Sequence, residues 1–451
     1  MGHIYENLRT RLCNQKPACT CRFLILAFSL VHIAFVSKAQ YSPPLTDTGK
    51  NSTHAQAEAL LKKLSGITIT GFMEPEFQVG QSKGENTFSG GNFPANSNSR
   101  FIIRRGRLRT TYTALDKNAL PYVEICFEVD GTQKGVTINE FWGRVYENKW
   151  QVLSFSTGML VRPFGYEINY PTRQFDSPER GRMSQTLMRG EVDLGAMISF
   201  EPRKKDNPLR YFKASAGIFN GQGLTGPTEF DSFKDIIGRV CLKPYPLAPN
   251  LFLSAGISYF TGGIEQNSRY IYHAVNTAGG KINMIDSAAD NVGKKAPRRY
   301  FGTDLQLKWV HKKGGATEIR AEYWQGKQAA SLSSSETPAS LLLEPYSVRN
   351  FNGAFFYLLH SITARHQLCA KYDFYDPNTD VCKSDIGRPA SNFSAADIKY
   401  STWGLGYIYY WNLNLKLMLW YDIVRNEATQ LNGYTSDVKD NVFTCRLQFK
   451  F

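Results

Sequence analysis

The stretch "RFIIRRGRLRT", residues 100–110, carries five arginines within a pattern that otherwise predicts a β-strand. Arg105, Arg107 and Arg109 recur at every second residue, so in a strand their guanidinium groups project from one face. A row of cations on one face of a sheet could bind nucleic acid, form a salt-bridged surface or line a water-filled pore. Its members would lie about 7 Å apart, a spacing at which an anion could step between weak sites.

Acidic residues accompany this row on the neighbouring strands. The residues "DKNA" (116–119) join the arginine strand to the next one, and a simple hairpin pairs positions that sum to about 235. That register predicts the pairs Arg107 with Glu128, Arg105 with Asp130 and Arg109 with Cys126. The carboxylates expected on the same side as the arginines are Glu74, Glu76, Glu124, Glu128 and Asp130. Two interpretations therefore stay open: an anion-conducting row, and a charge-compensated ladder that stiffens the wall and adds little net positive field.

The N-terminus has the pattern of a secretory signal. Basic residues precede the apolar run "FLILAFSLVHIAFV" (23–36), and "SKAQ" follows it with small residues at positions 37 and 39. A membrane-spanning helix needs about 18 or more apolar residues, so the run is too short to be one. We expect residues 1–39 to be a signal peptide. Residues 40–65 are then a periplasmic segment, either a short amphipathic helix or unstructured, and residues 66–451 form the main domain.

The composition is that of a folded protein with an anionic partner. Apolar residues make up 42% and charged residues 20% of the chain, which is typical of folded proteins rather than disordered ones. The formal charge of the whole chain is +14. Residues 1–39 contain five basic residues and one acidic residue, so their removal leaves a charge of +10, which favours small anions, lipid headgroups or nucleic acid as partners.

From residue 66 onward the sequence alternates between apolar and polar residues. In "NLNLKLMLWYDIV" (412–424) and "NVFTCRLQFKF" (441–451), apolar residues occupy one face of the predicted strand and mostly polar residues the other. Long polar links at 80–100, 161–190, 220–232, 261–298, 326–346, 373–396 and 425–437 take turns with short ones. The exception is "GTQKG" (131–135), which is short where a long link is due. Counting the segments between links gives about 16 strands.

These features predict an all-β fold, a 16-stranded antiparallel transmembrane β-barrel with long external loops and short periplasmic turns. A soluble sandwich would also alternate, but it rarely keeps long and short connections in turn through such a length. Each arginine facing lipid at the bilayer midplane would cost about 2–4 kcal/mol, so the three arginines of the row must face the lumen. A lumenal row cannot reach a duplex groove, which excludes nucleic acid as a partner.

The remaining motifs do not point to chemistry. The five cysteines after residue 39 show no zinc-site spacing, although Cys369 and Cys382 could pair. "GQGLTG" (221–226) fits a dinucleotide-binding glycine pattern, but Pro227 and a strand-like run follow it instead of a helix. Ser361 beside His360 is the nearest candidate for a phospholipase-like barrel enzyme, yet adjacent residues of a strand point to opposite faces. We expect no catalytic residue, metal or cofactor.

Several segments resemble the phosphate-selective porin O and P family of Gram-negative outer membranes. They are "RFIIRRGRLRTTYTALD", "YVEICFEVDG", "LSFSTGMLVRPFGYE", "SPERGRMSQTLMRGEVDLGAMI" and "AGIFNGQG…FKDIIGRVCLKP", with "GITITGFMEPEFQVGQ" as the first strand. The resemblance runs from about residue 66 to the C-terminus. It implies a 16-stranded barrel in outer-membrane lipid, usually trimeric, through which small anions or other small solutes diffuse.

The resemblance also implies two features of the chain. The third long link, 161–190, would fold inward to narrow the pore, and its basic residues are Arg162, Arg173, Arg180, Arg182 and Arg189. Phe451 would be the aromatic C-terminal signal that the outer-membrane insertion machinery reads. The expected function is an outer-membrane porin biased toward anions such as phosphate, and the alternative is a non-selective or oligosaccharide-type porin with a charge-compensated lumen.

Overall fold

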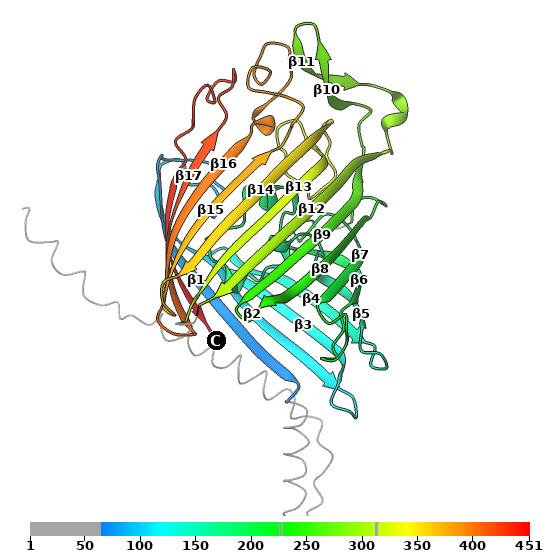
Figure 1. The fold of residues 1–451 in the computed structure, drawn as a ribbon. Helices are drawn as coiled ribbons and strands as arrows, with labels where there is room; N and C mark the ends of the chain where they lie inside the picture. The colour runs from blue at the N-terminus through cyan, green and yellow to red at the C-terminus, as the bar shows by residue number, and fades with distance from the viewer. Residues whose placement is uncertain (1–64, 225, 227–228, 312–313) are drawn as a thin grey trace, which may run out of the picture. The chain divides into compact units, whose positions relative to one another are not determined.

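The computed structural model describes residues 65–224, 226, 229–311 and 314–451. They form one sheet, antiparallel except for one short pairing, with three short helical segments in the loop 162–191 and two more, η2 (Ala289–Asn291) and η3 (Ala395–Asp397), in later loops (Figure 1). The strands are β1 (Ile67–Gly80), β2 (Ser99–Leu115), β3 (Pro121–Thr132), β4 (Gly135–Tyr146), β5 (Leu153–Val161), β6 (Val192–Phe200), β7 (Phe212–Phe219), β8 (Asp235–Ala248), β9 (Leu251–Glu265), β10 (Ile271–Thr277), β11 (Gly280–Asp286), β12 (Lys295–Val310), β13 (Ala316–Ser331), β14 (Tyr346–Ser361), β15 (His366–Asp376), β16 (Tyr400–Tyr410), β17 (Leu415–Asn426) and β18 (Val442–Lys450).

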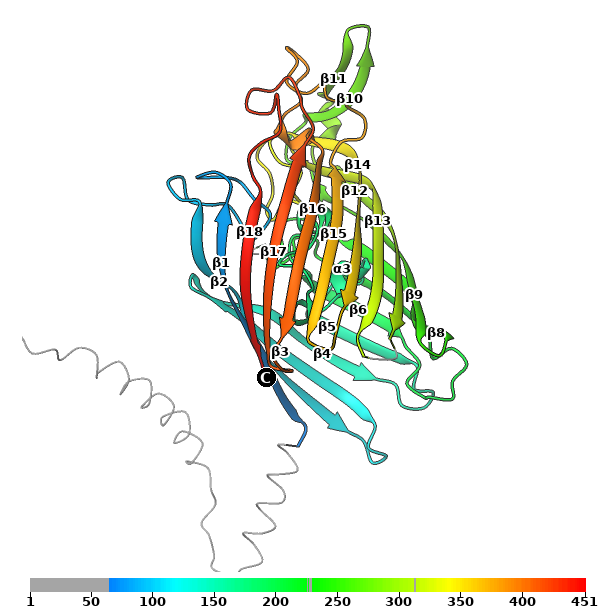
Figure 2. The same cartoon turned by 60° about the vertical axis from the view of Figure 1, so that its left-hand side comes forward.

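Sixteen of these strands close into a barrel, which confirms the predicted fold class. β1 pairs with β18 to close the wall, and β9 pairs directly with β12. The hairpin β10–β11 therefore lies outside the barrel wall, and it touches the wall through a short parallel pairing with β14 (Figures 1 and 2). Closure leaves no free sheet edge around the ring, as a lipid environment requires.

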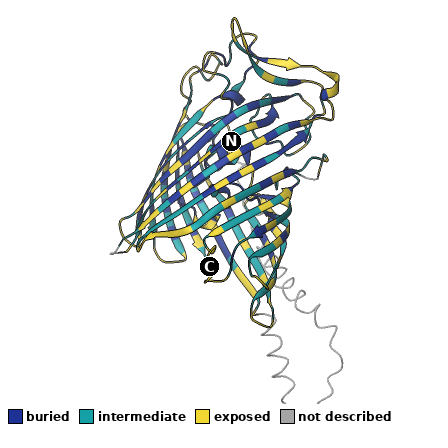
Figure 3. Cartoon of the chain, turned by 45° about the vertical axis from the view of Figure 1, so that its right-hand side comes forward, coloured by how far each residue is buried: buried dark blue, intermediate teal, exposed yellow. Residues whose placement is uncertain are grey.

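The predicted alternation determines which side chains enter the barrel. Along β17 and β18, Lys416, Asp422 and Arg446 are buried inside, while Tyr421 and Phe449 are exposed on the outer wall. Buried and exposed residues alternate in the same way along the other strands (Figure 3). The outer wall is consequently apolar, and an apolar outer wall suits contact with lipid.

The two ends of the barrel differ. One end, which we call the short-turn end, carries the connections 116–120, 147–152, 201–211, 249–250, 311–315, 362–365 and 411–414. The opposite, long-loop end carries 81–98, 133–134, 162–191, 220–234, 266–294, 332–345, 377–399 and 427–441. The short connection noted in the sequence at 131–135 joins β3 to β4 at the long-loop end.

The register between β2 and β3 differs from the prediction by two residues. Arg107 lies opposite Asp130, Arg109 opposite Glu128, and Cys126 opposite Thr111, so the predicted pairs of all three arginines were wrong. A shift between Ala114 and Leu115 next to the turn adds an irregularity that a simple hairpin does not have. Because the difference is two residues, each arginine keeps its face.

β2 also contains a bulge that the alternation did not reveal. Glu74 pairs with Arg105 and Pro75 with Ile103, so Arg104 has no opposite residue on β1. Such a bulge shifts the alternation by one residue. It brings Arg104 to the same side as Arg105, and a strictly alternating strand would have turned this cation toward lipid.

Several predictions for the chain ends and the cysteines can be placed. The predicted signal peptide and residues 40–64 lie outside the described residues. Among the described residues, no helix has both the length and the apolar character needed to cross a membrane. Cys369 is buried in β15 and Cys382 is exposed in the loop that follows, and both are free thiols, so they do not form the disulfide considered above.

Candidate functional site: the lumen and its inner loop

Residues 162–191, which we call the inner loop, lie inside the barrel (Figure 2). The loop contains α3 (Tyr166–Asn169), η1 (Thr172–Gln174) and α4 (Arg182–Leu187). Strands from several sides of the wall hold its middle part: Lys416 Nζ donates to the Phe175 carbonyl at 2.8 Å, and the Ser177 and Tyr357 hydroxyls lie 2.7 Å apart. The loop therefore narrows the lumen, as the family resemblance implied.

Glu179 is the ionic anchor of the inner loop. Its carboxylate lies 2.5 Å from Arg104 Nε, 2.7 Å from Arg105 Nη2 and 3.3 Å from Arg446 Nη2. Burial raises the pKa of Glu179, but the three guanidinium groups outweigh burial and hold this pKa well below its usual range. The side chain is therefore a carboxylate at any pH near neutrality. Arg104 can take part only because of the bulge.

An apolar core fixes the other side of the inner loop to the wall. Phe164 is fully buried, with its ring centroid 4.8 Å from that of Trp324 on β13. The core includes Ile168, Met183 and Leu187 of the loop and inward-facing Phe219, Ile237, Phe260, Tyr300, Phe351 and Tyr375 of β7, β8, β9, β12, β14 and β15. The lumen is thus not uniformly polar, because the inward faces of these strands are a packing surface for the loop.

The arginine row of β2 is fully paired with carboxylates. Arg107 lies 2.8 Å from Glu191 and 3.2 Å from Asp130, and Arg109 lies 2.9 Å from Glu140 and 3.1 Å from Glu128. Arg105 pairs with Glu74 as well as Glu179, and only 4% of its surface is exposed. The row is therefore a compensated ladder, with its first member covered by the inner loop.

The other predicted carboxylates are also paired. Glu74 and Glu76 both lie close to Arg446 of β18, at 3.3 and 2.6 Å. Glu124 lies 3.4 Å from Arg144 and accepts a hydrogen bond from the Tyr146 hydroxyl at 2.5 Å. These ion pairs link β1 to β18 and β3 to β4.

The predicted arginines of the inner loop occupy different environments. Arg162 is buried and donates to the Gly190 carbonyl, and Arg180 forms an ion pair with Glu191 at 3.0 Å. Arg182 stacks between the rings of Phe88 and Tyr400. The remaining two are exposed: Arg189 lies 3.6 Å from Glu336, whereas Arg173 has no hydrogen-bond or ion-pair partner among the described residues.

A large water-accessible space, which we call the vestibule, occupies the short-turn half of the lumen. It consists of two cavities of about 850 and 710 Å³ that share Arg109, Glu124 and Glu140 in their walls. Nine basic and five acidic side chains line the vestibule. The basic residues are Arg107, Arg109, Arg144, Arg173, Arg180, Arg203, Lys213, Lys243 and Lys450, and the acidic residues are Glu124, Glu128, Glu140, Glu191 and Glu201.

All five acidic residues of the vestibule form ion pairs, including Glu201, which lies 3.0 Å from Lys213 and 3.2 Å from Lys243. Lys450, at the end of β18, resembles Arg173 in that its ammonium group has no hydrogen-bond or ion-pair partner among the described residues. The surplus charge of the vestibule is therefore positive.

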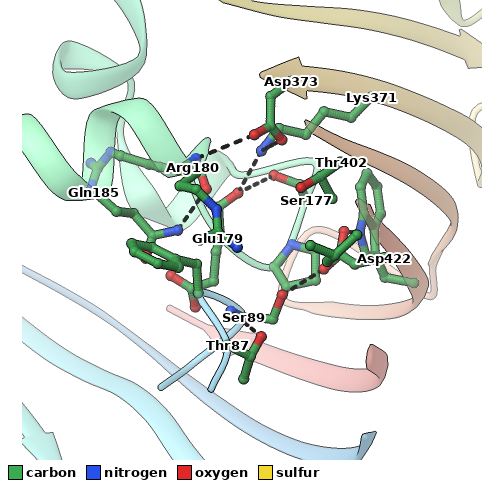
Figure 4. Close-up of a pocket in the computed structure, with 15 residues that line it drawn as sticks. Thr87, Ser89, Ser177, Glu179, Arg180, Gln185, Lys371, Asp373, Thr402 and Asp422 are labelled. Atoms are coloured by element: carbon green, nitrogen blue, oxygen red, sulfur yellow. Dashed lines mark hydrogen bonds and ion pairs between the residues drawn. The ribbon is translucent and has the colours of Figure 1, made fainter. Parts of the chain in front are cut away.

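A small polar pocket of about 30 Å³ lies on the opposite side of the inner loop, where residues 87–89 of the first long loop also fold inward (Figure 4). Ser89 Oγ donates to Asp422 at 2.7 Å, and Lys371 Nζ donates to the Glu179 carbonyl at 3.3 Å. The volume suits one or two water molecules rather than a solute. Two loops, not one, therefore occupy the lumen on this side.

Several residues of the lumen were not singled out in the sequence. They are Arg104, Arg320, Lys371, Lys416 and Arg446. The alternation places Lys416 and Arg446 on the polar face, but it gives no sign of which loop they hold.

Two of the histidines, His311 and His360, share the hydroxyl group of Thr317 on β13. His360 Nδ1 lies 2.9 Å from the Thr317 hydroxyl rather than forming a pair with its neighbour Ser361, and the same hydroxyl lies 2.8 Å from His311 Nε2. No group of three or more His, Cys, Asp or Glu residues in the described part of the chain could hold a metal ion.

Comparison with known proteins supports a porin fold. OprB of Pseudomonas putida superimposes with a TM-score of 0.56 at 11% identity, over 88% of this chain and 97% of that one. An anion-selective porin of Comamonas acidovorans (TM-score 0.48, 12% identity, 85% and 99% covered) and the trimer form of OmpT of Vibrio cholerae (0.45, 10%, 85% and 99%) are similar over comparable lengths. At these identities the likeness concerns the fold alone. The conclusion about the fold rests on the comparison with OprB, whose TM-score is above 0.5. No curated protein matches the sequence.

The family match lies in the last strands. The sequence profile described as phosphate-selective porin O and P matches residues 364–451, from the turn before β15 to the C-terminus. The motifs quoted above for the resemblance lie earlier in the chain, and the match adds β15–β18 to them. The profile and the barrel together support an outer-membrane porin channel. Over residues 364–451 the chain is similar to the phosphate-selective porin O and P family, in line with the resemblance seen in its earlier segments.

Proposed function

We propose that the protein is a passive channel for small hydrophilic solutes with a bias toward anions. The observation that carries the proposal is the charge imbalance of the vestibule, where every carboxylate is paired while Arg173 and Lys450 are not. A surplus of fixed positive charge in a narrow aqueous space raises the local concentration of anions and lowers that of cations. Phosphate is one anion of this class.

The arginine row contributes less to this bias than its sequence suggests. Arg105, Arg107 and Arg109 face six carboxylates at 2.7–3.4 Å, so their field is largely cancelled close to the wall. This compensation is the observation that favours the second candidate, a channel without ion preference for neutral solutes such as oligosaccharides. The two candidates make opposite predictions for the vestibule cations.

Reversal potentials in a KCl gradient across a planar bilayer test the proposal. We expect the wild-type channel to prefer chloride, and the double variant Arg173→Gln/Lys450→Gln to lose most of that preference while its conductance persists. The matched control Lys134→Gln/Lys439→Gln removes the same charge from exposed positions of the long-loop end and should behave as wild type. A non-selective or cation-selective wild type would contradict the proposal and favour the neutral-solute channel.

The orientation and assembly follow from the same function. We propose that the short-turn end and the N-terminus face the periplasm, after residues 1–39 are removed as a signal peptide, with residues 40–65 as a periplasmic segment. Phe451 would be read by the insertion machinery before its backbone pairs with Gly71 in the closed wall. We further propose a homotrimer in outer-membrane lipid, as in the trimer form of the Vibrio cholerae porin. Cross-linking in native membranes would test it.

A further inference from the structure

The outer wall carries an open groove, with both aromatic and basic side chains, close to the long-loop end. The groove has a volume of about 530 Å³ and is lined by Tyr259, Arg299, Phe301, Gln325, Lys327 and Asn350 of β9, β12, β13 and β14, among others. Arg299 and Lys327 are both exposed on the side of the wall that faces away from the lumen. We call this site the outer-wall groove.

Two like charges lie directly opposite each other in this groove. Arg299 of β12 pairs in register with Lys327 of β13, and Lys327 pairs with Asn350 of β14. Side chains at directly opposite positions are about 4.5–5.5 Å apart at Cβ, and like charges there destabilise a sheet. Neither Arg299 nor Lys327 has an ion-pair or hydrogen-bond partner among the described residues.

Two carboxylates of the adjoining loop and strand do not form ion pairs with Arg299 or Lys327. Asp380 accepts a hydrogen bond from Asn350 Nδ2 at 2.7 Å, and Asp376, opposite Asn352, lies 3.8 Å from Lys399 Nζ. Asp376 is also two strands from Lys327, which is about 10 Å. No carboxylate of the described residues forms an ion pair with Arg299 or Lys327, so an external anion that bridges them would stabilise the pair.

The position of the pair on the wall indicates the kind of anion. Tyr259 and Phe301, which are paired in register and exposed, lie one row closer to the membrane centre than Arg299. Beyond them the exposed side chains are aliphatic, including Ile257 and Leu305. Exposed aromatic residues mark the edge of the apolar band of a barrel, so the two cations lie at headgroup level.

We propose that the outer-wall groove binds a phosphorylated glycolipid of the outer leaflet. Arg299 and Lys327 would hold one phosphate, since guanidinium and ammonium groups are the usual protein partners of phosphate. The amides of Gln325 and Asn352 lie beside them in the next row, where sugar hydroxyls would lie, and the acyl chains would pack on Phe301 and Tyr259. The assignment to the outer leaflet rests on the orientation proposed above.

Native mass spectrometry of the full protein, reconstituted in vesicles that contain diphosphorylated lipid A on both faces, tests the site independently of orientation. We expect retained lipid A on the wild type and at least tenfold less on Arg299→Gln/Lys327→Gln. The control Lys134→Gln/Lys439→Gln removes the same charge elsewhere at the long-loop end and should retain the lipid. Equal loss in the control, or retention in the Arg299/Lys327 variant, would overturn the proposal.

Two further measurements separate other occupants. Inorganic phosphate at millimolar concentration should not displace the lipid, and displacement would show that the groove is a site for free phosphate. A Gln325→Cys variant should not form disulfide-linked dimers in the membrane, and such dimers would show that a second copy of the chain covers the groove. Either outcome would replace the lipid proposal. Reversal potentials should be unchanged in Arg299→Gln/Lys327→Gln, so failure of this proposal leaves the proposed channel function untouched.

Discussion

At the scale of single residues, Glu179 determines how firmly the inner loop is held on its ionic side. It connects the loop to β2 and β18, the two strands on either side of β1. Removing one partner of a buried ion pair leaves charges without compensation, which commonly costs about 3–5 kcal/mol. An exposed pair usually contributes about 0–1 kcal/mol.

Glu179→Gln should therefore release this side of the loop. We expect faster cleavage by trypsin within residues 173–182, a lower temperature of heat modification on gels and noisier single-channel currents. The control Glu336→Gln breaks the exposed pair with Arg189 and should leave all three unchanged. If Glu179→Gln is cleaved and heat-modified like the wild type, the position of the loop does not depend on the ion pairs of Glu179.

The lowered pKa of Glu179 also predicts acid resistance. A carboxylate whose pKa is lower in the folded than in the unfolded state stabilises the fold above its unfolded pKa, and this stabilisation is lost as the pH falls through the folded value. The ion pairs of Glu179 should thus persist as the pH is lowered from 7 to about 4, near the ordinary value for glutamate. Opening of the loop between pH 7 and 5, detected as a rise in trypsin-type cleavage or conductance, would contradict this expectation.

Asp440, in the loop 427–441, behaves in the opposite way. Burial raises its pKa to about 6 despite the nearby charge of Arg182. Because the folded pKa exceeds the ordinary value, ionisation costs stability, and this loop should be more stable at pH 5 than at pH 7. Hydrogen exchange of residues 427–441, corrected for intrinsic rates, should show this difference in the wild type and in the exposed control Asp290→Asn, and not in Asp440→Asn.

At the scale of elements, the sequence predicts the strands well and their contacts poorly. Alternation places Lys416 and Arg446 inside because the period of a strand is two, and this signal is local. The bulge at Arg104 and the register of β2 against β3 depend on hydrogen bonds to another strand, which alternation does not encode. The apolar core is hidden for a related reason: an inward Tyr300 or Trp324 looks the same in sequence as a residue that faces lipid.

The apolar core makes a separate prediction for Phe164. Truncation of a fully buried phenylalanine to alanine commonly costs about 3–5 kcal/mol. Phe164→Ala should detach α3 from β13 and increase the conductance, because the loop would no longer be held on its apolar side. Phe155→Ala, which shortens a half-exposed side chain of the outer wall, should not change the conductance. An unchanged channel in Phe164→Ala would mean that the ionic contacts alone hold the loop.

At the scale of the whole molecule, the β10–β11 hairpin is not part of the barrel wall, because β9 pairs directly with β12. Asn283 N donates to the Ser391 carbonyl at 2.7 Å, so the hairpin packs against the loop 377–399 rather than completing the wall. The loops at this end share a small apolar core that contains Ile386, Phe393 and Ile398.

Replacing residues 270–287 by a short Gly-Ser link should leave the barrel intact. We expect unchanged membrane insertion and heat modification, because β9 and β12 already pair along their length, together with faster proteolysis of residues 377–399. Failure of the variant to insert would show that the hairpin is needed for assembly.

Apolar packing holds the inner loop on one side and ion pairs hold it on the other, and this asymmetry has an evolutionary consequence. The apolar core attaches the inner loop to the barrel wall. Substitutions in this core would therefore destabilise the packing of the loop. The ionic side also borders the vestibule, where Arg173 and Lys450 do not help to hold the loop, so on the proposed function an exchange of either residue would change which solutes permeate while the loop stays in place. The selectivity of the channel can therefore evolve through a few substitutions near Arg173, while the barrel and the position of the inner loop stay the same.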